Sequence, residues 1–155
     1  LNNKIKIKFF KFLLIMFFLT NCGYQPIYIQ KDNIKITLNK IDLMGDKKIN
    51  RKIIQLTNLE KNNSDQASYN LKLKSNKNIE IVAKDQSGNA TTYRTTITVA
   101  FTLEYQDKIF KQKTFISKFS YNNIVNKFDL SQYQKTIENN LISKIAEEII
   151  FFINT

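Results

Sequence analysis

Apolar and polar side chains alternate more regularly along residues 91–105 than anywhere else in the chain. The odd positions there are mostly large and apolar, as at Ile97 and Phe101, whereas the even positions are mostly threonine and include Arg94. A period of two with many β-branched residues is typical of a strand that buries one face. We therefore expect a long strand with a buried odd-numbered face and a polar even-numbered face.

Three other segments show a weaker alternation that also predicts strands. The first covers residues 34–39, and the second begins near Ala67, bends or bulges at residues 76–78 and resumes its apolar face at Ile79. The third covers residues 109–121. Its aromatic residues fall on both parities, so we expect either a bulge or two buried faces there.

A helix is expected from about residue 47 to residue 61. Gly45 breaks the preceding strand, and the Asp46 side chain can cap the helix by accepting hydrogen bonds from backbone N–H groups. Apolar residues then recur at helical spacing and form one stripe, for which packing in the core is a sufficient explanation. These residues are Ile49, Ile53, Leu56 and Leu59.

A longer helix is expected near the C-terminus, with Asp129 or Ser131 as its cap. Its last part, residues 149–153, is apolar nearly all round, which fits either a buried helix or contact with a partner or membrane. Burial in the core is the simpler interpretation. The apolar residues of its buried side are expected to be Tyr133, Ile137, Leu141, Ile142, Ile145, Ala146, Ile149, Phe152 and Ile153.

The predicted order of elements is strand, helix, three strands and helix. Helices gathered on one face of a mixed or antiparallel sheet make an α+β two-layer sandwich. We therefore expect two helices packed on one face of a four-stranded sheet. The odd-numbered face of the strand at 91–105 would contact the helices, and the even-numbered face would present Arg94 among threonines.

The N-terminal segment has the pattern of an export signal. Four lysines precede the uncharged run FLLIMFFL at residues 12–19, which is shorter than a membrane-spanning helix requires. The sequence Leu19-Thr20-Asn21-Cys22 then resembles a lipobox, although Asn21 departs from the usual small residue. We expect a signal peptide at 1–21, a lipidated tether at 22–30 and one α+β domain at 31–155. Plain secretion and an uncleaved anchor remain the alternatives.

Cys22 is the only cysteine, so it has no partner within the chain for a disulfide. A cysteine at the end of a lipobox can carry a thioether-linked diacylglycerol, and a further acyl chain on the new amino terminus makes such an anchor stable. Gly23 follows the cysteine in place of aspartate, which resembles the sorting pattern of outer-membrane lipoproteins. We therefore expect attachment to the outer membrane through Cys22.

The chain is strongly basic, with a net charge of +11. Four of these charges are lysines before Cys22, and all 13 acidic residues follow it, which leaves about +7 on the mature chain. An export signal makes nucleic acid a poor partner, whereas anionic lipid head groups or a phosphorylated glycolipid are natural partners outside the cytoplasm. A lysine-rich composition without any ligand is the simpler alternative for each individual lysine.

Residue types that support catalysis are scarce. The chain has no histidine, and acylation would remove its one thiol, which argues against histidine-based triads, thiol nucleophiles and most zinc sites. Glu147 and Glu148 are adjacent acids, but adjacent helix residues do not share a face. We therefore expect no enzyme activity, no metal and no cofactor beyond the covalent lipid.

The mature sequence resembles the LptE family, the lipopolysaccharide-assembly lipoproteins of the Gram-negative outer membrane. Residues 22–28, Cys-Gly-Tyr-Gln-Pro-Ile-Tyr, look like the family's start, especially in its alphaproteobacterial form. The turn at 88–93 and the threonine-rich strand after it resemble the family's central hairpin. The aromatic stretch 115–121 and the long final helix are similar to the family's end. The combination carries the match.

The resemblance implies a protein that plugs the LptD β-barrel, assists its assembly and helps move lipopolysaccharide to the outer leaflet. It places the domain inside the barrel lumen, facing the periplasm, and implies binding of lipopolysaccharide through basic residues. The candidates are Arg94 first, then Lys72 and Lys74, and less strongly Lys111 and Lys113. The alternative is a generic outer-membrane or periplasm-facing lipoprotein that binds another anionic ligand or a cell-wall polymer.

Overall fold

The strand predicted from the alternation is β3 (Ala90–Tyr105). The structure is a computed structural model that describes residues 36–61 and 69–155. Ile97 and Phe101 are completely buried, whereas the even-numbered side chains of β3 are partly exposed. The prediction of one buried face and one polar face is confirmed for this strand.

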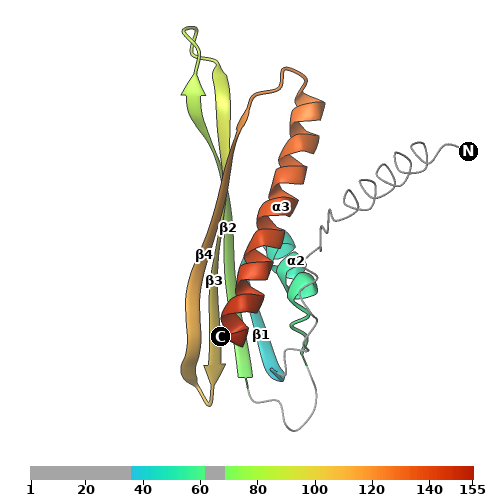
Figure 1. Cartoon of the computed structure of the whole chain (residues 1–155), viewed down its shortest axis with the longest axis vertical. Helices are drawn as coiled ribbons and strands as arrows, with labels where there is room; N and C mark the ends of the chain where they lie inside the picture. Colours follow the sequence, from blue (N-terminus) through green and yellow to red (C-terminus); the bar gives the residue numbers. More distant parts are fainter. Residues whose placement is uncertain (1–35, 62–68) are drawn as a thin grey trace, which may run out of the picture. The chain divides into compact units, whose positions relative to one another are not determined.

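Four strands form one mixed sheet in the order β1-β2-β3-β4 (Figure 1). Strands β2 (Tyr69–Lys84) and β4 (Lys108–Asn122) flank β3 and run antiparallel to it. Strand β1 (Leu38–Gly45) runs parallel to β2. A parallel neighbour requires a crossover connection, and helix α2 (Lys47–Thr57) lies in that connection.

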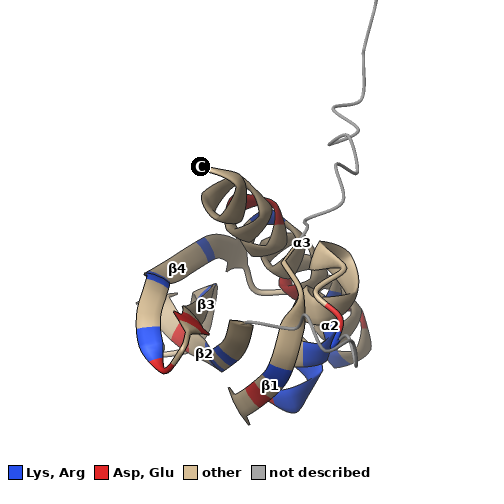
Figure 2. Cartoon of the chain, turned by 90° about the horizontal axis from the view of Figure 1, so that it is seen from below, with Lys and Arg blue, Asp and Glu red and all other residues tan. Residues whose placement is uncertain are grey.

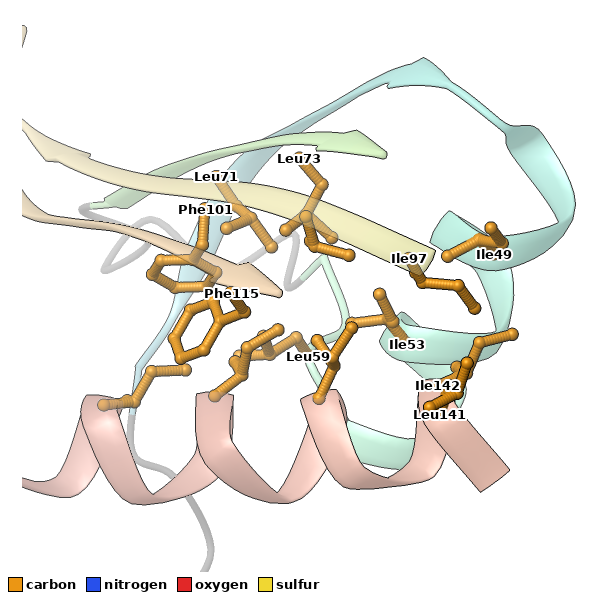
Figure 3. Packing of buried hydrophobic residues seen from close by; sticks show 14 of the residues in the cluster. Ile49, Ile53, Leu59, Leu71, Leu73, Ile97, Phe101, Phe115, Leu141 and Ile142 are labelled. Atoms are coloured by element: carbon orange, nitrogen blue, oxygen red, sulfur yellow. The ribbon is translucent and has the colours of Figure 1, made fainter. Parts of the chain in front are cut away.

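Helices α2 and α3 (Lys127–Asn154) both pack on the face of the sheet that carries the odd-numbered side chains of β3 (Figures 1 and 2). The predicted α+β sandwich is therefore confirmed. Between the layers lies a single apolar core, to which every strand and both helices contribute (Figure 3). Its largest fully buried side chains are Leu38, Ile49, Ile53, Leu71, Leu73, Ile97, Phe101, Leu103, Phe115, Ile142, Ile145 and Ile149.

The ends of the first two elements differ from the prediction. Strand β1 begins at Leu38 and continues to Gly45, because its pairing with β2 extends well past residue 39, and Ile34 and Lys35 lie outside the described residues. Helix α2 has the predicted Asp46 cap but ends at Thr57, since Asn58 adopts a left-handed conformation with φ of 52°.

The apolar stripe of α2 is only partly correct. Ile49 and Ile53 are completely buried, but Leu56 is partly exposed. Leu59 is buried although it lies beyond the end of the helix. The chain after Asn58 therefore turns back against the core in an irregular conformation, which the helical spacing did not indicate.

Strand β2 contains no bulge at residues 76–78, which corrects the prediction. These residues pair regularly with β3, and the register shifts lie further on, around Ala83. Ile79 and Ile81 do lie on the helix side, but their exposed fractions are 42% and 49%. Strand β1 pairs with β2 only as far as Ser75, so no described strand borders the rest of this edge.

The last two elements follow their predictions more closely. The bulge expected in β4 lies opposite Leu103 and Glu104. Its second apolar face is not buried, because Ile116 is 61% exposed. Helix α3 begins earlier than expected, with the Asn126 side chain accepting hydrogen bonds from two backbone N–H groups, so neither Asp129 nor Ser131 is its cap. The buried side of α3 is as predicted at Ile137, Leu141, Ile142, Ile145, Ala146, Ile149 and Ile153.

The connection between β1 and α2 is held against β2 by a close backbone contact. Gly45 has φ of 81°, and a Cβ atom at this position would lie 1.9 Å from the carbonyl oxygen of Ser75. That oxygen accepts a hydrogen bond from the Asp46 N–H at 3.1 Å. The buried Asn50 side chain donates to the Met44 carbonyl at 2.8 Å. Only glycine fits this turn, which fixes where α2 starts over the sheet.

We predict that Gly45→Ala lowers the free energy of unfolding by about 2–4 kcal/mol, because the methyl group meets backbone and the left-handed φ is strained as well. Gly88→Ala is the matched control. Gly88 also has a positive φ, of 85°, but nothing lies within 4 Å of a Cβ atom there, so about 1 kcal/mol is expected. Urea unfolding measures both, and equal losses would contradict the close-contact explanation.

Candidate functional site: the open face of the sheet

No described helix covers the side of the sheet opposite α2 and α3 (Figure 1). Most side chains on that side are polar. We call this surface the open face. It consists of the even-numbered side chains of β2 and β3 and the β4 residues in register with them. Its paired rows include Lys72–Thr102–Gln112, Lys74–Ala100–Thr114, Asn76–Thr98–Ile116, Asn78–Thr96–Lys118 and Glu80–Arg94–Ser120.

Arg94 lies on the open face between two partners in its own row. Its Nε donates to the Ser120 hydroxyl at 3.1 Å, and its Nη1 lies 3.4 Å from Glu80 Oε1. These contacts orient the guanidinium along the surface of the sheet. They use two of its five N–H donors, so the remaining donors are available to an anionic group.

Lys72 and Lys74 also lie on the open face, but their surroundings differ. The Lys72 ammonium lies 2.6 Å from Glu104 Oε1, and the hydrogen bond to this carboxylate raises the pKa of Lys72. Lys74 is exposed, and no described carboxylate lies within ion-pair distance of it. Lys74 is therefore the more available of the two cations.

Lys118 belongs to the same surface, although it was not among the residues predicted from the sequence. It is exposed and stands opposite Thr96 in β3. As with Lys74, no described acid is paired with it. The register of β4 decides this placement, and the mixed parity of β4 concealed that register. The even-numbered face of β3 together with the correct pairing would have identified it.

Lys111 and Lys113 lie on the other side of the sheet, because the bulge in β4 pairs them with the buried residues Leu103 and Phe101. The Lys111 ammonium donates to the carbonyl oxygens of Phe152 at 3.1 Å and Ile153 at 2.9 Å. A cation at these carbonyls stabilises the C-terminal end of α3. The Lys113 ammonium lies 5.0 Å from the centre of the Phe115 ring. The five predicted basic residues therefore form two separate groups.

The most buried carboxylate among the described residues is Glu138 on α3. Its side chain is 8% exposed and contacts Lys48 of α2 at 2.8 Å and Lys77 of β2 at 2.7 Å. Burial acts to raise the pKa of Glu138, but the hydrogen bonds from Lys48 and Lys77 and their charges outweigh burial, so the pKa lies below its ordinary value. Both oxygens are occupied by cations, and the carboxylate joins three elements.

We predict that Glu138→Gln destabilises the domain at pH 7 by about 1–2 kcal/mol, because the partly buried Lys77 and the exposed Lys48 lose their common counter-charge. A carboxyl with a lowered folded-state pKa stabilises the fold above its unfolded pKa, and this contribution is lost as the pH falls through the folded-state pKa. The difference from the parent protein should therefore shrink in acid, as followed by thermal unfolding.

Glu147→Gln is the control for this comparison, since Glu147 is exposed on the same helix. It should change stability by no more than about 0.5 kcal/mol at either pH. A pH-independent loss in Glu138→Gln would show that the amide disturbs packing instead of removing a charge.

The described side chains suit binding at a surface. Among them, no group of three His, Cys, Asp or Glu residues is arranged to hold a metal ion. No helix within residues 36–61 and 69–155 is long and apolar enough to cross a membrane. The open face instead offers hydroxyl, amide and cationic groups across three adjacent strands, a composition that suits water, sugar hydroxyls and phosphate oxygens.

No family model and no curated protein matches this chain. Solved structures with a similar fold do exist. Rare lipoprotein B from Shewanella oneidensis is 15% identical with a TM-score of 0.54, and the match covers 72% of this chain and 91% of that one. A minor lipoprotein from Acinetobacter baumannii is also 15% identical, with a TM-score of 0.55 and coverage of 76% and 92%. Lipoprotein B from Nitrosomonas europaea is 8% identical, with a TM-score of 0.56 and coverage of 74% and 81%.

At these identities the comparison shows the fold alone. The domain thus has a fold that is also found in several bacterial lipoproteins. Cys22 and the tether at 22–30 lie outside the described residues, so lipidation at Cys22 stays a prediction from the sequence.

Proposed function

We propose that this chain is an LptE-type outer-membrane lipoprotein, anchored through Cys22, that plugs an LptD-like β-barrel and assists its assembly in lipopolysaccharide transport. Its role is structural and not enzymatic. The observation that carries this proposal is the open face, a broad polar surface on a sheet whose other face packs against the helices and carries the core.

The open face has the properties that a water-filled barrel lumen requires. Its threonine, asparagine and serine side chains can exchange hydrogen bonds with water or with the polar inner wall of a barrel. The sheet is four strands wide and long in the strand direction, and all four strands lie in one layer. A surface of this kind can lie along a barrel wall without burying unpaired polar groups.

Two lines support the proposal: the sequence resemblance points to the LptE family, and the fold comparison is consistent with a bacterial lipoprotein. The sequence resemblance rests on the Cys22–Tyr28 start, the central hairpin and the C-terminal helix. The fold is shared with proteins that are themselves bacterial lipoproteins. Neither line depends on the other, because the fold comparison involves identities of 15% or less for these neighbours.

The same surface supports binding of lipopolysaccharide. Arg94, Lys72, Lys74 and Lys118 share the open face, and charge-assisted hydrogen bonds from such groups to phosphate are strong. Arg94 retains free donors, and Lys74 and Lys118 have no described counter-ion. Lys111 and Lys113 belong to the α3 end of the domain, so we assign lipopolysaccharide binding to the open-face group.

Affinity purification of the tagged full-length protein from outer membranes tests the barrel partnership. We expect a large β-barrel protein to co-purify in comparable amount. A protein that is acylated and located in the outer membrane, yet yields no barrel, would contradict the plug and leave a generic lipoprotein that binds another anionic ligand or cell-wall polymer.

Binding of purified lipopolysaccharide tests the ligand assignment. The double variant Lys74→Ala/Lys118→Ala should bind roughly thirtyfold more weakly at low salt, because each of the two lysines near an anionic surface contributes about 1 kcal/mol. The matched control is Lys135→Ala/Lys144→Ala, which removes two exposed lysines from α3. Equal losses in the two double variants would show that total charge, and not the open face, controls binding.

A further inference from the structure

Exposed aromatic and aliphatic side chains gather at the end of the domain where β3 turns into β4. Tyr105 is 39%, Ile109 61%, Phe110 53% and Phe151 71% exposed. The Tyr69 ring of β2 joins two of them, since its centre lies 5.1 Å from that of Tyr105 and 5.4 Å from that of Phe110. We call this surface the tether end.

Lysines surround these rings. Lys108, Lys111 and Lys113 all lie in the first part of β4, and Figure 2, which views the domain from below, shows basic segments along this strand. The Lys111 ammonium lies 6.0 Å from the centre of the Phe110 ring and 5.5 Å from that of Phe152. The nearby acids do not cancel this charge, because Glu104 is paired with Lys72 and only Asp107 remains in the turn.

The chain that leads back to Cys22 enters the domain at this same end. The backbone N–H of Tyr69 donates to the Thr37 carbonyl at 3.2 Å, so the start of β1 lies beside the residue that contacts both Tyr105 and Phe110. Residues 22–35 precede the described domain. Fully extended, they reach at most about 50 Å, so the start of β1 lies within that distance of a membrane that holds Cys22.

We propose that the tether end docks on the anionic phospholipid head groups of the bilayer that holds Cys22, a proposal that rests on the lipidation stated above. Tyrosine and phenylalanine side chains suit the boundary between head groups and acyl chains. Lysines attract anionic lipids. Anchoring makes the contact intramolecular in effect, so a small surface with weak intrinsic affinity is sufficient.

The chain contains no tryptophan, so a single tryptophan reports on one chosen position. Phe110→Trp places the reporter at the tether end. Val82→Trp is the matched control, because Val82 is partly exposed but lies near the other end of β2, about 40 Å from Tyr69 along the strand. The full-length acylated protein is reconstituted into phosphatidylethanolamine vesicles, with or without phosphatidylglycerol, that contain brominated acyl chains.

With phosphatidylglycerol present, the Phe110→Trp emission should shift to shorter wavelength and be quenched by the brominated lipid, whereas Val82→Trp should show neither effect. Without the anionic lipid, quenching at position 110 should fall strongly. Lys108→Glu/Lys113→Glu in the Phe110→Trp protein should reduce the docked population by roughly tenfold or more. Lys127→Glu/Lys135→Glu, which reverses two exposed lysines in the first part of α3, should leave quenching unchanged. Circular dichroism verifies that each variant is folded.

An unquenched tryptophan at position 110, equal quenching at positions 82 and 110, or quenching that ignores phosphatidylglycerol would each overturn the proposal. A tryptophan at position 110 that is unquenched in the vesicles, but shielded from an aqueous quencher in native outer membranes, would identify a protein as the occupant instead. The outcome is separable from the proposed function. Mass spectrometry of the same sample establishes acylation of Cys22, and recovery of a barrel partner is measured without vesicles.

Discussion

The rest of the structure depends on the burial of one face of β3 against the helix layer. The odd-numbered side chains from Ile97 to Leu103 are completely buried, and α3 supplies most of the residues that cover them. Side chains alternate across a strand, so burying these residues forces their even-numbered neighbours onto the opposite surface. The threonine-rich open face is therefore a direct consequence of how the core is packed. A shift of one residue in the register of β3 would exchange the two surfaces.

The helix layer and the sheet layer have different roles. The helix layer provides stability, through the apolar core and through Glu138, which connects α2, α3 and β2 by ion pairs. The sheet layer has one face left over, and that face carries Arg94, Lys72, Lys74 and Lys118. Lys111 and Lys113 are not part of the open face, because they lie on the helix side of the sheet and contact the end of α3. The basic residues of β4 therefore make different contacts, according to the side of the sheet on which each one lies.

Local sequence was sufficient wherever a residue's environment follows from its neighbours in the chain. The alternation in β3, the Asp46 cap and the buried stripe of α3 are of this kind. Features that depend on distant segments were misjudged. The start of β1 depends on pairing with β2, and the regular course of residues 76–78 depends on β3. The candidate site follows the same rule. The parity of β3 was enough to place Arg94 correctly. The bulge in β4 puts Lys111 and Lys113 on the other face and Lys118 on the open face, which the sequence of β4 alone did not indicate.

The central claim is that the open face lies against the inner wall of a barrel, and crosslinking from that face tests it most directly. A photoreactive amino acid at Thr98, in the middle of the open face, samples whatever contacts this surface in living cells. The account predicts a crosslinked product with a large outer-membrane β-barrel protein. An acylated and normally located protein that gives no barrel product from Thr98 or from its neighbour Thr96 would contradict the account.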